Sequence, residues 1–262
     1  MSNVVIKILP LSLFLSLFIS LSVSAEDDVQ DMSNPLAVYT QLGAGYTDKG
    51  INLKAGKSYD TGSASTMAMS VIEIKGIAGE ALGWNGEARK NTNDSIDSAR
   101  FRNIKVNTKN GRGSQVDVNY NFNYDFGTAS YSFIQASPKF GPLQLFPLAG
   151  LGAAFGNNVV GDDGEVISGY SVPGTFGLVG MYTKIEITDK LWLNFNPMWM
   201  TTLSGSDLYK EHGFENDDSI LRQEVAVSYQ FTPVFNVRYF SNWSDKTDFA
   251  DGDHRIEFNY QF

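Results

Sequence analysis

Apolar and polar residues alternate with a period of two along most of this chain, and this pattern limits the fold more than any other feature. It is clearest in residues 113–124, where Val, Tyr and Phe alternate with Gln, Asp and Asn. The closing stretch 256–262 (IEFNYQF) repeats it and ends on an aromatic residue. Successive side chains of a strand point to opposite faces, so the pattern predicts strands with one apolar and one polar face.

A soluble antiparallel sandwich would also alternate, because one face of each sheet meets water. Its packed core, however, would call for more strands that are apolar throughout, whereas here strand after strand keeps a polar face. We therefore predict an all-β, membrane-spanning, antiparallel up-and-down β-barrel of about twelve strands, within a range of about 10–14. The expected strands are residues 37–46, 50–59, 64–78, 98–109, 113–124, 128–139, 143–155, 170–187, 190–201, 220–231, 233–243 and 253–262.

The lengths of the connections support an even strand number. If both ends of the barrel sequence lie in the periplasm, every second connection must be a short turn. The five connections at this end, at residues 60–63, 110–112, 140–142, 188–189 and 232–233, are tight and contain Gly, Pro, Asn or Asp. The longer connections, at 79–97, 156–169, 202–219 and 244–252, all fall at the opposite, extracellular end, where the connections at 47–49 and around 126–127 are short exceptions.

The N-terminus has the features of an export signal. Lys7 precedes an apolar run at residues 8–23, and Ala25 ends a small-residue cleavage motif before Glu26. The run is short for a membrane span. The expected organisation is a signal peptide at 1–25, a short periplasmic tail at 26–36 and a transmembrane barrel at 37–262.

Composition excludes several other classes of protein. The chain has no cysteine, so no disulfide framework holds an exported fold together. Its formal net charge of −9 argues against nucleic acid as a partner. No later apolar stretch has the length of a helical membrane span.

The register of alternation assigns side chains to the two faces of the wall. The charged residues predicted to line the lumen, and to select solutes by charge, are Lys54, Glu73, Lys75, Lys105, Asp117, Lys184, Glu186, Arg222, Glu224, Arg238, Arg255 and Glu257. They make the lumen mildly basic. A salt-bridge network that fills a narrow barrel is the less favoured alternative for the same residues. Two aromatic girdles are predicted, from Tyr124, Tyr131, Trp199 and Trp243 at the outer rim and from Phe140, Phe231, Tyr260 and Phe262 at the periplasmic rim.

Two stretches depart from the pattern, because 144–154 and 173–180 are apolar on both faces and rich in Gly. An inward-folded loop packing there, bends of the wall at Gly, or an apolar ligand patch would each explain them. The outer loops are acidic but lack the fixed spacing of an EF-hand, so solvated loop surface is favoured over a Ca²⁺ site.

Catalytic and metal sites are not expected. The chain has two histidines, His212 in a long loop and His254 at the outer end of the last strand. His254 has Asp251, Asp253, Ser241 and Ser244 nearby, but such coincidences are common in loops, and catalysis needs a base held at a nucleophile. Two dispersed histidines without cysteine also make a zinc site improbable, and no cofactor is expected.

In its export signal, its alternating last strand 256–262 and its terminal Phe262, the chain resembles the Gram-negative outer-membrane β-barrel family. Its length and strand count are similar to those of the small monomeric twelve-stranded porins. The resemblance implies an outer membrane with lipid and lipopolysaccharide around the barrel, and recognition of the last strand by the barrel-assembly machinery. It implies a monomeric channel for passive diffusion of small hydrophilic solutes. The alternatives are a closed structural barrel with adhesive or receptor loops and, less favoured, a lipid-modifying enzyme.

Overall fold

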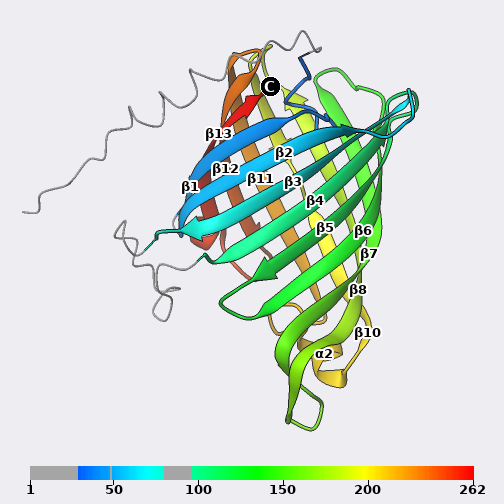
Figure 1. The fold of residues 1–262 in the computed structure, drawn as a ribbon, viewed down its shortest axis with the longest axis vertical. Coiled ribbons are helices and arrows are strands. Elements are labelled where there is room, and N and C mark those ends of the chain that lie inside the picture. Colours follow the sequence, from blue (N-terminus) through cyan, green and yellow to red (C-terminus); the bar gives the residue numbers. More distant parts are fainter. Residues whose placement is uncertain (1–28, 48, 80–95) are drawn as a thin grey trace, which may run out of the picture.

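One antiparallel sheet closes on itself to form a barrel in the computed structural model, which describes residues 29–47, 49–79 and 96–262 (Figure 1). Its strands are β1 Gln41–Thr47, β2 Gly50–Asp60, β3 Thr66–Ile77, β4 Ser98–Asn107, β5 Arg112–Asn121, β6 Phe126–Gln135, β7 Leu143–Val160, β8 Val166–Glu186, β9 Leu191–Phe195, β10 Met198–Gly205, β11 Ser219–Thr232, β12 Phe235–Ser244 and β13 Asp253–Gln261. Each strand pairs with its sequence neighbours, as tight turns between extended segments favour. The barrel closes where β1 pairs with β13, with Gln41 opposite Gln261.

β9 and β10 are two halves of one interrupted strand. Both pair with β8 on one side and with β11 on the other. The break falls at Asn196 and Pro197, and proline has no N–H to give to a neighbouring strand. Counted as one, they make this a barrel of twelve strands, as the sequence predicts.

The two ends of the barrel differ. Five short connections, at 61–65, 108–111, 136–142, 187–190 and 233–234, lie at the same end as the last residue of β13, and we call it the turn end. The opposite end, which we call the loop end, carries the β7–β8 hairpin and helix α2 (Asp207–His212), seen at the bottom of Figure 1. The 3₁₀ helix η2 (Phe249–Asp251) precedes β13. Among the described residues, no helix is both long enough and apolar enough to cross a membrane.

All twelve predicted strands are present, and the main differences concern the loop end. Residues 156–169 were expected to form a loop, but β7 and β8 continue to pair, with Val160 opposite Val166, and leave only residues 161–165 as the connection. The expected loop at 202–219 contains the end of β10 and helix α2. The expected signal peptide, residues 1–25, lies outside the described residues.

Candidate functional site: the barrel lumen and its N-terminal segment

The burial pattern of the strands is the reverse of that in a soluble protein. In β13, Glu257 and Asn259 are each 2% exposed, whereas Ile256 and Phe258 are 47% and 40% exposed. Directly paired residues of neighbouring strands point to the same side of the sheet, so the register extends this assignment around the barrel. Polar side chains therefore line the lumen, and apolar side chains cover the outer face.

This register brings together almost all the charged residues predicted to line the lumen. Those that face inward are Lys54, Glu73, Lys75, Asp117, Lys184, Glu186, Arg222, Glu224, Arg238, Arg255 and Glu257. Most of them contact another member of the set or the N-terminal residues described below.

Lys105 was wrongly predicted to face the lumen. It is exposed on the outer face of β4, opposite Ala68 and Ser114. Its neighbours Ile104 and Val106 point inward and are 5% and 6% exposed. The alternation was misread because apolar residues occupy inward positions here, where other parts of the chain pack inside the barrel.

Two lumen arginines on the same strand were missed. Arg100 and Arg102 lie inward of β4, and Arg100 Nε is 2.8 Å from Asp117 Oδ1. Arg102 stands opposite Asp117 across the strand pair. Phe101 between them is 39% exposed, so this short run does alternate correctly and would have identified both. With these two and without Lys105, the set comprises eight bases and five acids.

Ion pairs link three strands, β2, β3 and β13, across the β13–β1 closure. Lys54 Nζ on β2 lies 2.5 Å from Glu257 Oε1 on β13. Arg255 lies 3.4 Å from Glu257 and 3.2 Å from Glu73 on β3, which also pairs with Lys75 at 3.7 Å. Because these acids are buried, the pairing offsets a desolvation cost that either partner alone would carry.

Residues 29–39, which we call the N-terminal segment, enter the lumen at the turn end. Leu36 and Val38 are 6% and 3% exposed and belong to an apolar cluster inside the barrel. The wall contributes Met69, Val71, Ile104, Val106, Ile134, Phe146 and Leu148 to that cluster. The expected periplasmic tail, as far as the structure describes it, is thus packed against the inner wall.

The preceding residues of the segment are held by polar contacts. The Gln30 N–H donates to Gln261 Oε1 at 3.1 Å, and Gln261 Nε2 donates back to the Gln30 carbonyl at 2.9 Å. Arg238 donates to the carbonyl of Met32, and the Asn236 amide lies 3.4 Å from the Met32 sulfur. The lumen wall of β12 and β13 thus binds the segment through both its main chain and a side chain.

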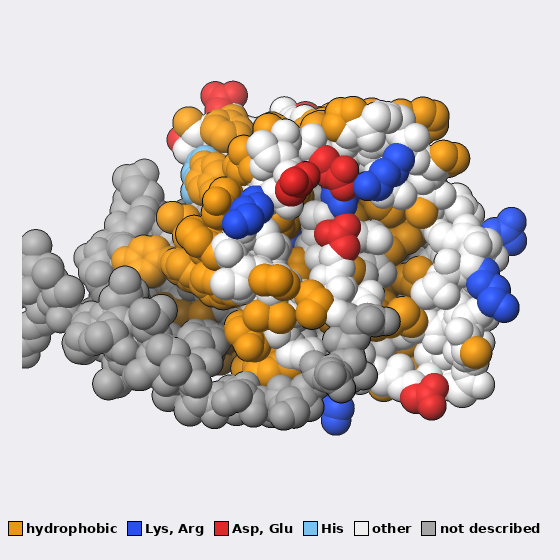
Figure 2. All heavy atoms as spheres, turned by 90° about the horizontal axis from the view of Figure 1, so that it is seen from above, with side chains coloured by type: hydrophobic (Ala, Val, Ile, Leu, Met, Phe, Trp, Pro, Cys, Tyr) orange, Lys and Arg blue, Asp and Glu red, His pale blue; other side chains and the backbone are white. Residues whose placement is uncertain are grey.

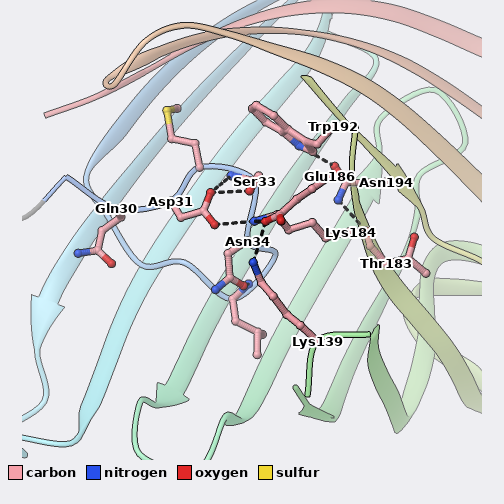
Figure 3. Close-up of polar contacts among 12 residues, drawn as sticks. Gln30, Asp31, Ser33, Asn34, Lys139, Thr183, Lys184, Glu186, Trp192 and Asn194 are labelled. Atoms are coloured by element: carbon pink, nitrogen blue, oxygen red, sulfur yellow. Dashed lines mark hydrogen bonds and ion pairs between the residues drawn. The ribbon is translucent and has the colours of Figure 1, made fainter. Parts of the chain in front are cut away.

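Asp31 joins a chain of alternating charges that Figure 3 shows converging on Lys184. Lys184 Nζ lies 2.7 Å from Asp31 and 2.7 Å from Glu186, which also pairs with Lys139 at 2.9 Å. Burial raises the pKa of Asp31, but hydrogen bonds from Lys184 and Ser33 outweigh it and hold that pKa below its ordinary value. The carboxylate is therefore ionised at neutral pH.

The inner wall is tightly packed around the segment at the turn end, and several charged side chains toward the loop end are partly exposed. Around the segment, Asn236 and Ser228 are 0% and 1% exposed. Toward the loop end, the side chains of Arg222, Arg100 and Lys75 are 58%, 32% and 26% exposed. Figure 2, which views the turn end, shows acidic and basic side chains side by side on this face.

The loop at 206–218, which carries α2, folds against the inner wall at the loop end. The Phe214 ring packs edge-on against Phe176 of β8, with centroids 5.8 Å apart. Tyr209 lies so close to Gly174 that a Cβ there would stand 2.1 Å from its ring. Of the explanations for the apolar stretches of β7 and β8, inward packing is confirmed, by this loop and by the N-terminal segment.

The predicted girdle residues on the strands lie on the outer face, but they form rings less regular than expected. Phe231, Tyr260 and Phe262 lie near the turn end, with Phe140 in a turn there. Tyr124 and Trp243 lie near the loop end. Tyr131 and Trp199 instead lie within their strands; β10, for example, continues to Gly205, well beyond Trp199.

His254 contacts a tyrosine hydroxyl and a main-chain carbonyl. Its Nδ1 lies 2.8 Å from the Tyr239 hydroxyl, and its Nε2 lies 3.3 Å from the Ala250 carbonyl. The Ser241 hydroxyl is buried and has no hydrogen-bond partner. In the part of the chain that the structure describes, no three acidic or histidine side chains are grouped to hold a metal ion.

Comparison with known proteins gives a likeness of fold only. No protein-family model matches the chain, and no curated protein matches it. The NanC porin, in its rhombohedral crystal form, aligns over 85% of this chain and 98% of its own at 9% identity, with a TM-score of 0.51. The β domain of the Bordetella autotransporter BrkA covers 86% of this chain and 100% of its own at 7% identity, with a TM-score of 0.46. The chain thus has the closed, twelve-stranded fold of outer-membrane porin barrels.

Proposed function

We propose that the chain is an outer-membrane, porin-like channel through which small hydrophilic solutes diffuse passively. The observation that carries the proposal is the inner wall, where charged side chains such as Arg222, Arg100 and Lys75 keep contact with water toward the loop end. A charged, wet wall selects solutes by sign and size, which a solid apolar core cannot do. The proposal includes no catalytic step.

The outer face supports a location in the outer membrane. Its strands present apolar side chains such as Ile72, Phe133 and Leu151, which are 54%, 66% and 65% exposed. Such a band belongs in lipid, with lipopolysaccharide around the loop end. On this proposal a signal peptide exports the chain, the assembly machinery recognises β13, the turn end faces the periplasm, and the protein is a monomer.

Charge gives the channel a weak preference for anions. Eight bases face six acids along the wall once Asp253, which stands opposite Asn242, is counted, and Asp31 of the N-terminal segment adds a seventh acid. Because most of these groups are paired, the excess field is small, and modest selectivity is expected.

Conductance of the purified protein in planar bilayers tests the proposal, with folding checked by heat-modifiable gel mobility. Arg102→Gln should shift the reversal potential in asymmetric KCl toward cations, because it removes a lumen charge. Lys105→Gln is the matched control, since it removes the same charge from the outer face, and it should leave the potential unchanged. A folded protein that gives no conductance steps, with its N-terminal segment in place or replaced, would overturn the channel.

A closed surface barrel is the second candidate, and the packing of Leu36 and Val38 inside the turn end favours it. Its exposed loops would then act as adhesion or receptor sites. The same bilayer measurement separates the two candidates, because a permanently filled barrel gives no conductance steps even when its N-terminal segment is replaced.

A further inference from the structure

We propose that residues 29–34 form a releasable latch that gates the turn end of the lumen, while residues 36–38 remain anchored to the wall. The inference rests on the proposed channel function and adds a means of opening it. It follows from the different chemistry of the two parts, from the wall behind the latch, and from the turns within the latch.

Anchor and latch are held by different forces. Leu36 and Val38 are buried in an apolar cluster, and leaving it would expose apolar surface to water. The latch buries one apolar side chain, Met32, which is 3% exposed, and its other contacts are hydrogen bonds and the ion pair of Asp31, whose side chain is 57% exposed. Water and salt compete with such contacts, so the latch is the weaker part.

The wall groups behind the latch each keep one interaction without it. Lys184 keeps its ion pair with Glu186 when Asp31 leaves. Gln261 keeps the Pro233 carbonyl at 3.0 Å, and Asn236 keeps Asn259 at 3.1 Å. A buried polar group left unpaired is costly, so these second partners lower the free energy needed for release.

Arg238, which donates to the Met32 carbonyl, also has a second partner within the wall. Its guanidinium lies 5.5 Å from the ring centroid of Trp192, a cation–π contact within the wall. Each of these wall groups that contacts the latch thus has a second interaction. A segment whose wall partners keep other contacts when it leaves is suited to switching between a bound and a released state.

The latch also satisfies part of its own backbone. The Ser33 N–H donates to Asp31 Oδ1 at 2.9 Å, and the Asn34 N–H donates to the Asp31 carbonyl at 3.0 Å. Pro35, which has no N–H to bond, lies between the latch and the anchor, and Asn34 accepts hydrogen bonds from the Leu36 and Ala37 N–H groups that follow it. Residues 31–34 therefore form a compact turn that can swing from the wall about the anchored residues that follow.

Thiol labelling detects release directly, because the chain has no cysteine of its own. Asn236→Cys places the reporter at a site that is 0% exposed and contacts Met32. A small charged methanethiosulfonate reagent is applied to the full-length folded protein in lipid vesicles. Replacing residues 30–33 by Gly-Ser-Gly-Ser keeps the chain length and should raise the labelling rate about tenfold or more, because all the latch contacts are lost.

Asp31→Asn in the same reporter background is the milder variant. It should raise the rate about two- to fivefold, the range for one partly exposed ion pair. Asp189→Asn is its matched control, because it removes the same charge from a tight turn at the same end, and its rate should match the parent.

Single-channel conductance of the same proteins completes the test. A higher open probability in the Gly-Ser variant, alongside faster labelling, supports the gate. Labelling that stays at the parent rate overturns the latch, even if the channel conducts. Faster labelling with no conductance in any folded variant leaves a mobile segment but overturns both the gate and the channel.

Discussion

Glu257→Gln tests whether the lumen around the closure is dry enough for its ion pairs to matter. Glu257 is 2% exposed and contacts Lys54 at 2.5 Å and Arg255 at 3.4 Å. Glutamine keeps the volume and removes the charge. Arg255 then retains Glu73, but Lys54 has no other ion-pair partner among the described residues.

The expected cost is about 3–5 kcal/mol of unfolding free energy, because breaking a buried pair leaves one charge desolvated and uncompensated. The Lys54 side chain is 13% exposed, which places the expectation toward the lower part of that range. Removing both charges, with Lys54→Met and Glu257→Leu together, should recover most of the loss, since a buried pair can be replaced by apolar residues at little cost.

Urea unfolding in lipid vesicles, followed by tryptophan fluorescence and by gel mobility, measures the change. Asp217→Asn is the matched control, because Asp217 and Lys246 are also 2.5 Å apart but are 45% and 35% exposed. It should leave the unfolding free energy close to that of the parent, because water screens an exposed pair. If Glu257→Gln costs no more than this control, water screens the network and the buried-pair reasoning is refuted.

Three further outcomes are expected. Phe146→Ala should cost about 3–5 kcal/mol in the same assay, because Phe146 is 0% exposed inside the barrel; a cost below about 1 kcal/mol would contradict the packed turn end. The pKa of Asp31 is lowered, so its ion pair stabilises the docked latch above the ordinary carboxyl pKa of about 4 and is lost as the pH falls through the lowered value. Opening by acid should therefore begin below about pH 4 in bilayer recordings and be absent in Asp31→Asn. Tyr209→Ala should speed tryptic cleavage after Lys210 by about tenfold, since the buried ring fastens the α2 loop, whereas the exposed Leu208→Ala should not.

The strands and their order were predictable because they depend on local features. Alternation over 116–124 and 256–262 reports directly on which side chains share a face, and short turns with Gly, Pro, Asn or Asp force neighbouring strands to pair. Most of the lumen charges, including Arg255 and Glu257, followed from the same register.

The errors have a common physical origin. Lys105 was assigned inward because Ile104 and Val106 read as outward residues, yet they point inward toward Leu36 and Val38. A period-two pattern cannot distinguish an apolar side chain that meets lipid from one that meets another segment inside the barrel.

The sequence by itself determined that this chain forms a twelve-stranded barrel with a polar inner face, because faces and turns are encoded within a few residues of each other. Only the tertiary structure decided what fills that barrel. Asp31 and Lys184 are 153 residues apart, and nothing in the local pattern of either predicts their contact. The closed turn end arises from such distant pairings, which exist only once the wall has formed around the N-terminal segment.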